Sequence, residues 1–268
     1  MSNRRFSATD QRLANVQTWL DAFVVRHQQD TAAEQHNIDL KHAHSYRVFQ
    51  EATAICEALQ LSNAQRLLAQ SSALVHDTGR FPQYTRYKTF RDPDSLNHAR
   101  LGVATLREHS VLPQAGFSVG QSRDILLAVL LHNRKQLPSR LTPWHSRLCS
   151  IVRDADKLDI FAVMLEQVER PHNEQSPTLT LGLQTDPTHY SPALLDQVAA
   201  GGLVDYRHLV WVNDFKLLLT SWVSNFAFTV SRQRLRDSGL LTRLLATLPE
   251  THECAKLAES FTEQNPEA

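Results

Sequence analysis

Histidine and aspartate side chains recur at positions where helical periodicity turns a side chain toward an apolar face. His44 lies four residues before Val48, and His132 continues a stripe formed by Ile125 and Val129. The other residues placed in this way are His76, Asp77, His98, Asp154, Asp156 and Asp159. A buried charge without a partner costs several kcal/mol, whereas one divalent metal compensates several imidazoles and carboxylates at once. The pattern therefore predicts a metal site with mixed His and Asp ligands.

Each of these residues also has an ordinary structural explanation. A single inward histidine such as His44 is more often a hydrogen-bonded core residue than a ligand. His76 and Asp77 could cap the end of a helix, where the helix dipole favours histidine. The aspartates in 154–159 could be solvated or paired with neighbouring cations. Only the set as a whole indicates metal binding, and a set this large suits two metals bridged by a carboxylate.

Helical periodicity also predicts the elements that would position these side chains, because apolar residues recur at three- and four-residue steps. The predicted helices cover about 9–28, 39–60, 62–79, 95–108, 118–134, 142–169, 192–200, 207–233, 238–247 and 251–263. Residues 78–94 are predicted to form a structured loop, and 170–191 the longest irregular stretch. The predicted fold is all-α, a single helical domain over residues 1–268.

Composition excludes several other classes of protein. The chain has 8 glycines in 268 residues, too few for the turns of an all-β fold or the phosphate loop of a Rossmann fold. Lys and Arg number 28, as do Asp and Glu, so no positive surplus favours binding to nucleic acid.

Cysteine usage and hydropathy predict the compartment. Cys56, Cys149 and Cys254 lie far apart, which is typical of a reducing compartment and disfavours structural zinc. The N-terminus is polar, and no apolar run is long enough to cross a membrane, so we expect a cytoplasmic protein without a membrane partner.

Taken in order, the histidines and aspartates resemble the motifs of the HD-domain superfamily of metal-dependent phosphohydrolases. The matching segments are His44-Ser-Tyr-Arg-Val48, Leu74-Val-His-Asp-Thr-Gly-Arg-Phe81, Asn97-His-Ala-Arg-Leu-Gly102, Leu130-Leu-His-Asn133 and Ile151-Val-Arg-Asp-Ala-Asp-Lys-Leu-Asp159. The resemblance covers roughly residues 40–160. It implies an HD helical-bundle core at about 37–169, with an N-terminal helix at 9–28 and a C-terminal helical extension at about 190–263.

The resemblance also implies which side chains hold metal. Asp77 would bridge two metals, and His98 and His132 match the extra pair of those members that bind two. Helix phase does not choose between Asp154 and Asp156; the resemblance favours Asp156, with Asp154 as the alternative. The implied ligands are His44, His76, Asp77, His98, His132 and Asp156. The cofactor would be a divalent metal (Fe, Mn, Ni, Co or Zn, with Mg also open), two per chain in the dinuclear case.

Hydrolysis of a phosphoester or phosphoanhydride by a metal-activated water is the activity that the resemblance implies, with Asp77 accepting a proton. Cationic residues near the ligands could hold the phosphate, namely Lys41, Arg80, Arg134 and Lys157. Arg80 and Lys157 lie beside ligands in the chain, and we predict that both act in catalysis as well. Arg134 is more readily explained as surface charge, and for Lys41 both explanations stand. Residues 83–90 could cover a nucleotide base or be a packed loop.

The sequence leaves two other functions open. The same ligand pattern occurs in HD-domain oxygenases that use a mixed-valent di-iron centre and dioxygen. A regulatory HD module that senses a ligand without turnover is the second alternative. For the hydrolase, we expect a small phosphorylated substrate, such as a nucleotide, and no nucleic-acid partner. The apolar residues between 211 and 222 could form core, a wall of the site or a homodimer face.

Overall fold

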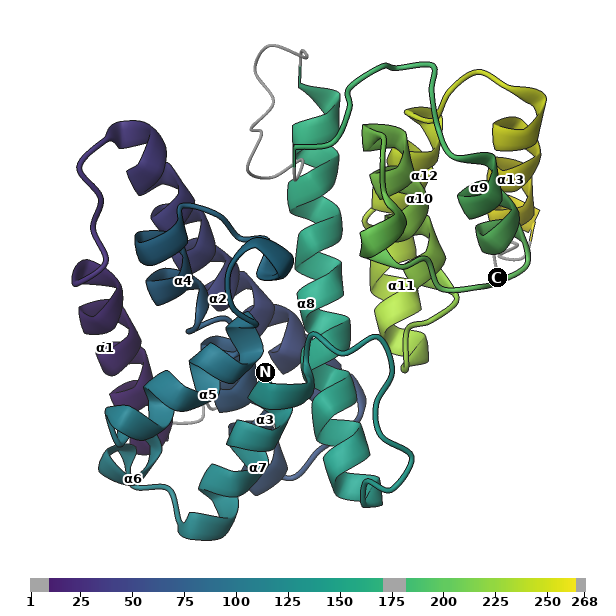
Figure 1. Cartoon of the computed structure of the whole chain (residues 1–268). Coiled ribbons are helices and arrows are strands. Elements are labelled where there is room, and N and C mark those ends of the chain that lie inside the picture. The colour runs from purple at the N-terminus through teal and green to yellow at the C-terminus, as the bar shows by residue number, and fades with distance from the viewer. Residues whose placement is uncertain (1–9, 171–181, 264–268) are drawn as a thin grey trace, which may run out of the picture. The chain divides into compact units, whose positions relative to one another are not determined.

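Helices account for nearly all regular structure of the protein (Figure 1) in its computed structural model, which describes residues 10–170 and 182–263. Within those two ranges no strand occurs, and the extended pairing is one isolated parallel bridge between Gln184 and Trp211. The all-α fold class predicted from the sequence is therefore confirmed. None of the described helices combines the length and apolar character that crossing a membrane requires.

The chain divides into two compact units, residues 1–156 and 157–268, and the division falls inside one long helix, α8. The elements up to and including that helix are α1 (Gln11–Val25), α2 (Ala32–Ala58), α3 (Asn63–Val75), α4 (Arg80–Tyr87), η1 (Asp92–Asp94), α5 (His98–Glu108), α6 (Val111–Ala115), α7 (Val119–Leu131) and α8 (Pro143–Glu169). The elements that follow are α9 (Pro192–Ala199), η3 (Tyr206–His208), α10 (Val212–Val223), α11 (Thr229–Asp237), α12 (Leu240–Ala246) and α13 (His252–Glu263). The single domain expected from the sequence stays a prediction.

The core of the N-terminal unit lies where α3 packs between α2 and α7. Its fully buried side chains include Ile38, Ile55, Leu74 and Ile125. Ser62 and Ser118 begin α3 and α7 with capping boxes, which satisfy amide groups that the first helical turn leaves free. Both helices end at a histidine, His76 and His132 respectively. Each of these two neighbouring helices therefore presents a histidine at its C-terminal end.

Gly79 lies against the start of α5. A Cβ atom at Gly79 would come within 2.1 Å of the His98 carbonyl oxygen and 2.6 Å of the Gly102 amide nitrogen. Heavy atoms cannot approach so closely, and both neighbours are main-chain atoms that cannot rotate away, so only glycine fits here. The contact holds the segment after α3 against α5 and brings Asp77 and His98 to the same region.

Two elements near the site differ from the sequence prediction. α2 begins at Ala32 rather than near residue 39, because the Thr31 hydroxyl accepts a hydrogen bond from the Glu34 amide and caps the helix. Its first turns carry no apolar stripe, so periodicity did not reveal them. The predicted loop over 78–94 contains α4, which ends where Lys88 adopts a left-handed φ of 53°.

The predicted single helix over 207–233 is wrong. α10 ends at Val223 and α11 begins at Thr229. In the break, the Asn225 side-chain amide donates to the Ser221 carbonyl at 2.8 Å, and Arg232 donates to the Phe226 carbonyl at 2.7 Å. Side-chain hydrogen bonds of this kind compete with those of a continuous helix. Half of the predicted irregular stretch at 170–191, residues 171–181, lies outside the described ranges.

The C-terminal unit is organised around a buried carboxylate at the start of α10. Asp214 accepts hydrogen bonds from the amides of Ser191, Val210 and Trp211 and from the Ser191 hydroxyl, at 2.6–3.0 Å. The side chain ties the segment before α9 to the beginning of α10. Asp214 is therefore satisfied by hydrogen bonds inside the unit, and other polar side chains of α10, such as Asn213 and Thr220, are buried with it.

Candidate metal centre

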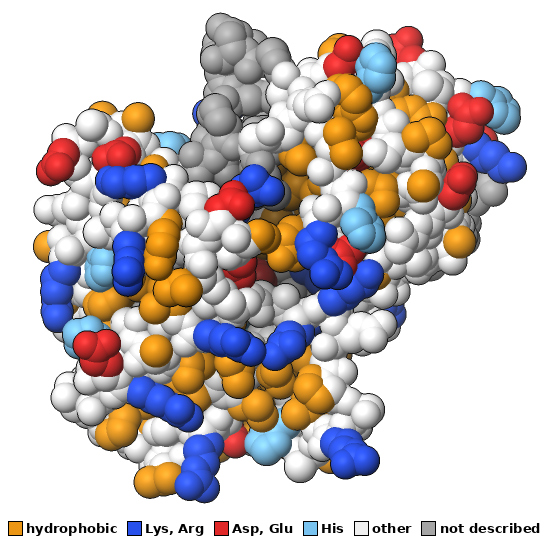
Figure 2. All heavy atoms as spheres, in the orientation of Figure 1, with side chains coloured by type: hydrophobic (Ala, Val, Ile, Leu, Met, Phe, Trp, Pro, Cys, Tyr) orange, Lys and Arg blue, Asp and Glu red, His pale blue; other side chains and the backbone are white. Residues whose placement is uncertain are grey.

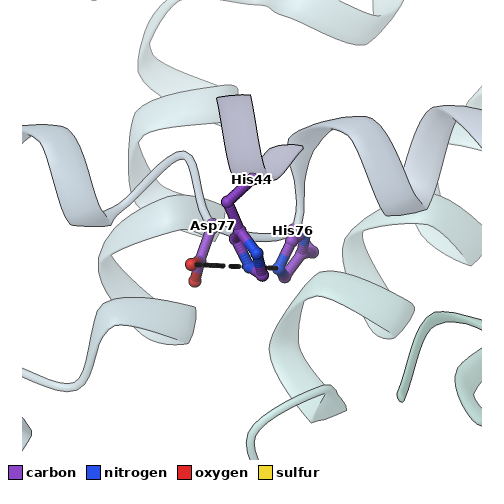
Figure 3. A group of neighbouring side chains, drawn as sticks. All are labelled: His44, His76 and Asp77. Atoms are coloured by element: carbon purple, nitrogen blue, oxygen red, sulfur yellow. Dashed lines mark hydrogen bonds and ion pairs between the residues drawn. The ribbon is translucent and has the colours of Figure 1, made fainter. Parts of the chain in front are cut away.

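Two imidazoles and two carboxylates converge in the N-terminal unit. His44 is carried by α2, His76 and Asp77 directly follow α3, and Asp156 is carried by α8. His44 Nε2 lies 3.2 Å from His76 Nε2 and 3.2 Å from Asp156 Oδ1. The Asp77 Oδ2 atom lies 3.5 Å from His44 Nε2 and 3.8 Å from His76 Nε2. Figure 3 shows His44, His76 and Asp77 facing one another. We call His44, His76, Asp156 and the Oδ2 atom of Asp77 the first ligand group.

Two further imidazoles approach Asp77 from its other oxygen. His98 is the first residue of α5, and His132 caps the end of α7. Their Nε2 atoms lie 3.5 Å and 3.6 Å from Asp77 Oδ1. We call His98, His132 and Asp77 Oδ1 the second ligand group.

Asp77 thus divides its two oxygens between the two groups. The two groups are also close to each other: the donor atoms of His76 and Asp156, from the first group, and of His132, from the second, lie within 4.8 Å of one another. A carboxylate with one oxygen toward each of two donor sets has the geometry expected of a bridge between two cations.

Hydrogen bonds to Nδ1 fix the tautomers of three of the four rings. His76 Nδ1 and His132 Nδ1 each lie 2.7 Å from a main-chain carbonyl, that of Ala73 and that of Val129. His98 Nδ1 lies 2.7 Å from Asp92 Oδ1. Carbonyl and carboxylate oxygens only accept, so each Nδ1 carries the proton and each neutral ring presents an Nε2 lone pair to the site.

The consequence is sharpest at His98 and His132, whose Nε2 atoms are 3.0 Å apart. Two lone pairs at that distance repel unless a cation lies beside both. A divalent metal bound by neutral imidazole and ionised carboxylate meets this requirement, so the donor set fits the metal that the sequence predicts.

The protonation states also match those of metal ligands. Burial alone raises the pKa of Asp77, but the charges around it, Lys41 above all, outweigh burial and hold that pKa well below the usual value. Burial likewise raises the pKa of Asp156, and interactions with His44 and His76 more than reverse it. Burial, with the charge of Arg80 nearby, lowers the pKa of His98 to about 3. The carboxylates are therefore ionised and His98 is neutral at pH 7.

The structure brings all six predicted ligands together. Of the two aspartates that helix phase left open, Asp156 reaches the first ligand group, whereas Asp154 belongs to none of the groups of potential metal ligands formed by the described residues. Asp154 is nonetheless buried, as is Asp159.

Two of the predicted phosphate-binding cations contact the same carboxylate. Lys41 Nζ lies 2.8 Å from Asp77 Oδ2, and Arg80 Nε lies 3.5 Å from Asp77 Oδ1. Arg80 also donates to the Phe90 carbonyl and to Gln83 Oε1. Much of the Arg80 guanidinium is thus used inside the protein, although its side chain, at 15% exposure, is as accessible as that of Lys41, at 14%.

The other two predicted cations have different surroundings. Arg134 is exposed, and its carbonyl accepts a hydrogen bond from Arg153. Lys157 Nζ lies over the rings of Trp222 and Phe226, at 5.8 Å and 5.7 Å from their centroids, in the C-terminal unit. Both stay predictions as phosphate-binding residues.

Residues 83–90 include the end of α4, and their side chains range from buried to exposed. Tyr84 and Phe90 are both buried, with ring centroids 4.9 Å apart, and the Tyr84 hydroxyl accepts a hydrogen bond from Asn37. Of the two explanations open from the sequence, the contacts made by Tyr84 and Phe90 favour packing.

Sequence reasoning missed Asp92, the carboxylate that holds His98. Burial raises the pKa of Asp92, but the hydrogen bond from His98 and the charge of Arg80 bring it below the usual value. Asp92 lies in a polar segment without an apolar stripe, so periodicity gave no sign of it. The available signal was its place six residues before a predicted ligand.

Comparisons with known proteins agree with this centre. The model of the family described as "HD domain" matches residues 42–160, the segment that carries all six converging ligands. A Bacillus subtilis (strain 168) protein named "Putative phosphohydrolase YueE" is 33% identical over 92 residues, which is 34% of this chain and 52% of that protein. The chain thus spans about half the length of this curated relative.

The resemblance noted from the sequence is confirmed: residues 42–160 match the HD-domain family. The family match ends within α8, so it does not extend to α9–α13.

Proposed function

We propose that this protein is a metal-dependent phosphohydrolase that cleaves a phosphoester or phosphoanhydride in a small, nucleotide-like substrate. The observation that carries the proposal is the division of the Asp77 oxygens between two ligand groups whose nitrogen lone pairs converge. The HD domain and the name of the curated relative support the same class of reaction.

The two ligand groups would hold one divalent metal each. When bound, such metals lower the pKa of a water molecule toward neutrality and neutralise charge on phosphoryl oxygens. The first group offers two imidazoles and two carboxylates, and the second offers two imidazoles and one carboxylate oxygen. The second group therefore has fewer protein ligands and leaves more room for substrate.

The chain itself would bind the substrate through local positive charge. Lys41 keeps its ammonium at the edge of the centre, where it could contact a phosphate oxygen. Figure 2 shows lysine and arginine side chains gathered around α5 and α7 on the face that it draws. An anionic substrate thus meets local positive charge although the whole chain has zero net charge.

Asp77 has a second role in the proposal, as the proton acceptor for the attacking water. Its low pKa makes it a weak base on its own. Proton transfer to it is feasible only from a water that is already acidified, which makes the reaction strictly dependent on metal.

The test is an anaerobic assay of phosphate release from generic phosphodiesters and nucleotides, with Mn²⁺ or Co²⁺ added to metal-free protein. Hydrolysis that requires metal and no dioxygen is the expected result. Iron-dependent dioxygen uptake without phosphate release would favour the oxygenase instead. Metal binding with no turnover of any phosphate ester would favour the ligand-sensing module.

A further inference from the structure

The three rings whose tautomers are fixed differ in what holds them. His76 and His132 are the C-terminal caps of α3 and α7, and each donates to the carbonyl three residues earlier in its own helix. Helix geometry alone supplies these partners. His98 is the first residue of α5 and has no preceding turn of that helix to supply a carbonyl.

Asp92 supplies the missing partner from outside the helix. Both of its oxygens lie close to His98 Nδ1, at 2.7 Å and 2.9 Å. A carboxylate acceptor makes an imidazole a stronger base toward metal than a carbonyl does, and it fixes the orientation of the ring. His98 therefore differs electronically from His132, its partner in the second ligand group.

The Asp92 carboxylate is itself held from several segments. Gln83 Nε2 on α4 donates to Oδ1 at 3.0 Å, and Arg80 approaches the same oxygen at 3.3 Å. The side-chain amides of Asn97 and Asn133 donate to Oδ2 at 3.2 Å and 3.3 Å. With so many donors, the carboxylate has a fixed position, which a residue that orients another one requires.

None of the hydrogen bonds and ion pairs described for Asp92 reaches His44, His76 or Asp156. Arg80 and His98, its two partners beside Asp77, both lie near Oδ1, the oxygen that belongs to the second ligand group. The effect of losing Asp92 should thus be confined to one of the two metal positions.

We infer that Asp92 is a positioning residue that sets the affinity of the second ligand group for its metal, by holding His98 with Nε2 turned toward Asp77 and His132. The inference rests on the proposed function, because it assumes that the centre binds two metals. It adds a role for η1, which none of the family's motifs in this chain includes.

The test is a titration of metal-free full-length protein with Mn²⁺ alone, followed by equilibrium dialysis and elemental analysis. We expect two ions per wild-type chain. Asp92→Asn should keep the tighter ion at unchanged affinity and bind the other about 10- to 100-fold more weakly, the usual effect of removing a carboxylate behind a metal-bound histidine. Asp92→Glu keeps the charge and should recover part of the loss.

Two variants serve as matched controls. Asp94→Asn removes a carboxylate from the same short helix, where it pairs with Arg91 at 3.0 Å. Asp124→Asn breaks another Asp–His pair, with His145 at 2.9 Å, away from the ligands. Both should bind two ions with wild-type affinity. Adding Asp92→Asn to His98→Ala should cause no further loss, because Asp92 acts through His98.

The outcomes separate this inference from the function on which it rests. Two ions bound at wild-type affinity by Asp92→Asn, or equal weakening of both ions, would overturn the positioning role and leave the hydrolase proposal standing. A wild-type chain that binds no Mn²⁺ would overturn the proposed function, and the inference with it. Thermal unfolding of each variant identifies a loss that comes from misfolding, and Asp92→Glu then decides the matter.

Discussion

The Nε2 atoms of His98 and His132 lie 3.0 Å apart, although each ring already donates its Nδ1 proton to an oxygen. In their neutral forms, neither ring has a proton on Nε2 to share with the other. The pair is therefore repulsive in isolation and becomes favourable beside a cation. From this relationship we expect the protein's stability, as well as the proposed activity, to depend on metal.

Metal removal should lower the melting temperature. A metal that binds only the folded protein stabilises it by about 2.7 kcal/mol at a concentration 100 times its dissociation constant. Differential scanning calorimetry with EDTA, and again after Mn²⁺ is restored, measures the effect. Equal melting temperatures in both conditions would show that the converging lone pairs do not hold a metal.

Asp77→Asn should abolish hydrolysis and reduce metal at both positions, because Asp77 is shared by both ligand groups. The matched variant Asp156→Asn removes a ligand from the first group and from the overlapping set of His76, His132 and Asp156, and it leaves Asp77 intact. It should therefore cost one metal rather than two. Elemental analysis of the two purified variants compares them directly, and equal metal content in both would contradict a shared Asp77.

Gly79→Ala should destabilise the protein by roughly 3 kcal/mol, the upper end for over-packing, because its Cβ meets main-chain atoms of His98 and Gly102. Gly120→Ala is the control, since the nearest atom to that Cβ is the Ser118 hydroxyl at 4.0 Å. It should be neutral or slightly stabilising. Urea denaturation of both variants gives the comparison, and similar midpoints would refute the close approach.

Lys216 should make stability depend on pH. Burial lowers its pKa to about 8 from 10.5, and its ammonium donates to the Thr247 carbonyl. Because the unfolded chain binds this proton more tightly, the cost of burying the charge is full below pH 8 and disappears above pH 10.5. The free energy of unfolding of wild type, relative to Lys216→Met, should therefore rise across this range. Urea denaturation between pH 7.5 and 10 measures it; a constant difference would show that the pKa is normal.

Much of the site could be predicted because its ligands follow helix periodicity. His44, His98 and His132 each lie on an apolar face and are buried. Because burying such a side chain without a partner is costly, their positions in the sequence already indicated a shared partner such as a metal. The choice between Asp154 and Asp156 needed coordinates, because both lie on buried turns of α8 and only one carboxylate reaches the histidines.

Other features could not be predicted because they depend on contacts between distant segments. Asp92 becomes important only when α4 and α5 bring Gln83 and His98 around it. The break between α10 and α11 depends on side-chain hydrogen bonds such as that of Asn225, while the apolar periodicity continues through it. Periodicity reports burial along one helix and carries no information about partners from elsewhere in the chain.

The contact at Gly79 has a consequence for redesign of the centre. Main-chain atoms, rather than side-chain rotamers, set how closely the segment carrying Asp77 approaches the start of α5. An engineer could therefore exchange the side chains at positions 98 and 132 for other ligands while the frame that carries them stays in place. The same rigidity means that a new ion must suit the existing spacing, because the backbone has no room to close further around a smaller one.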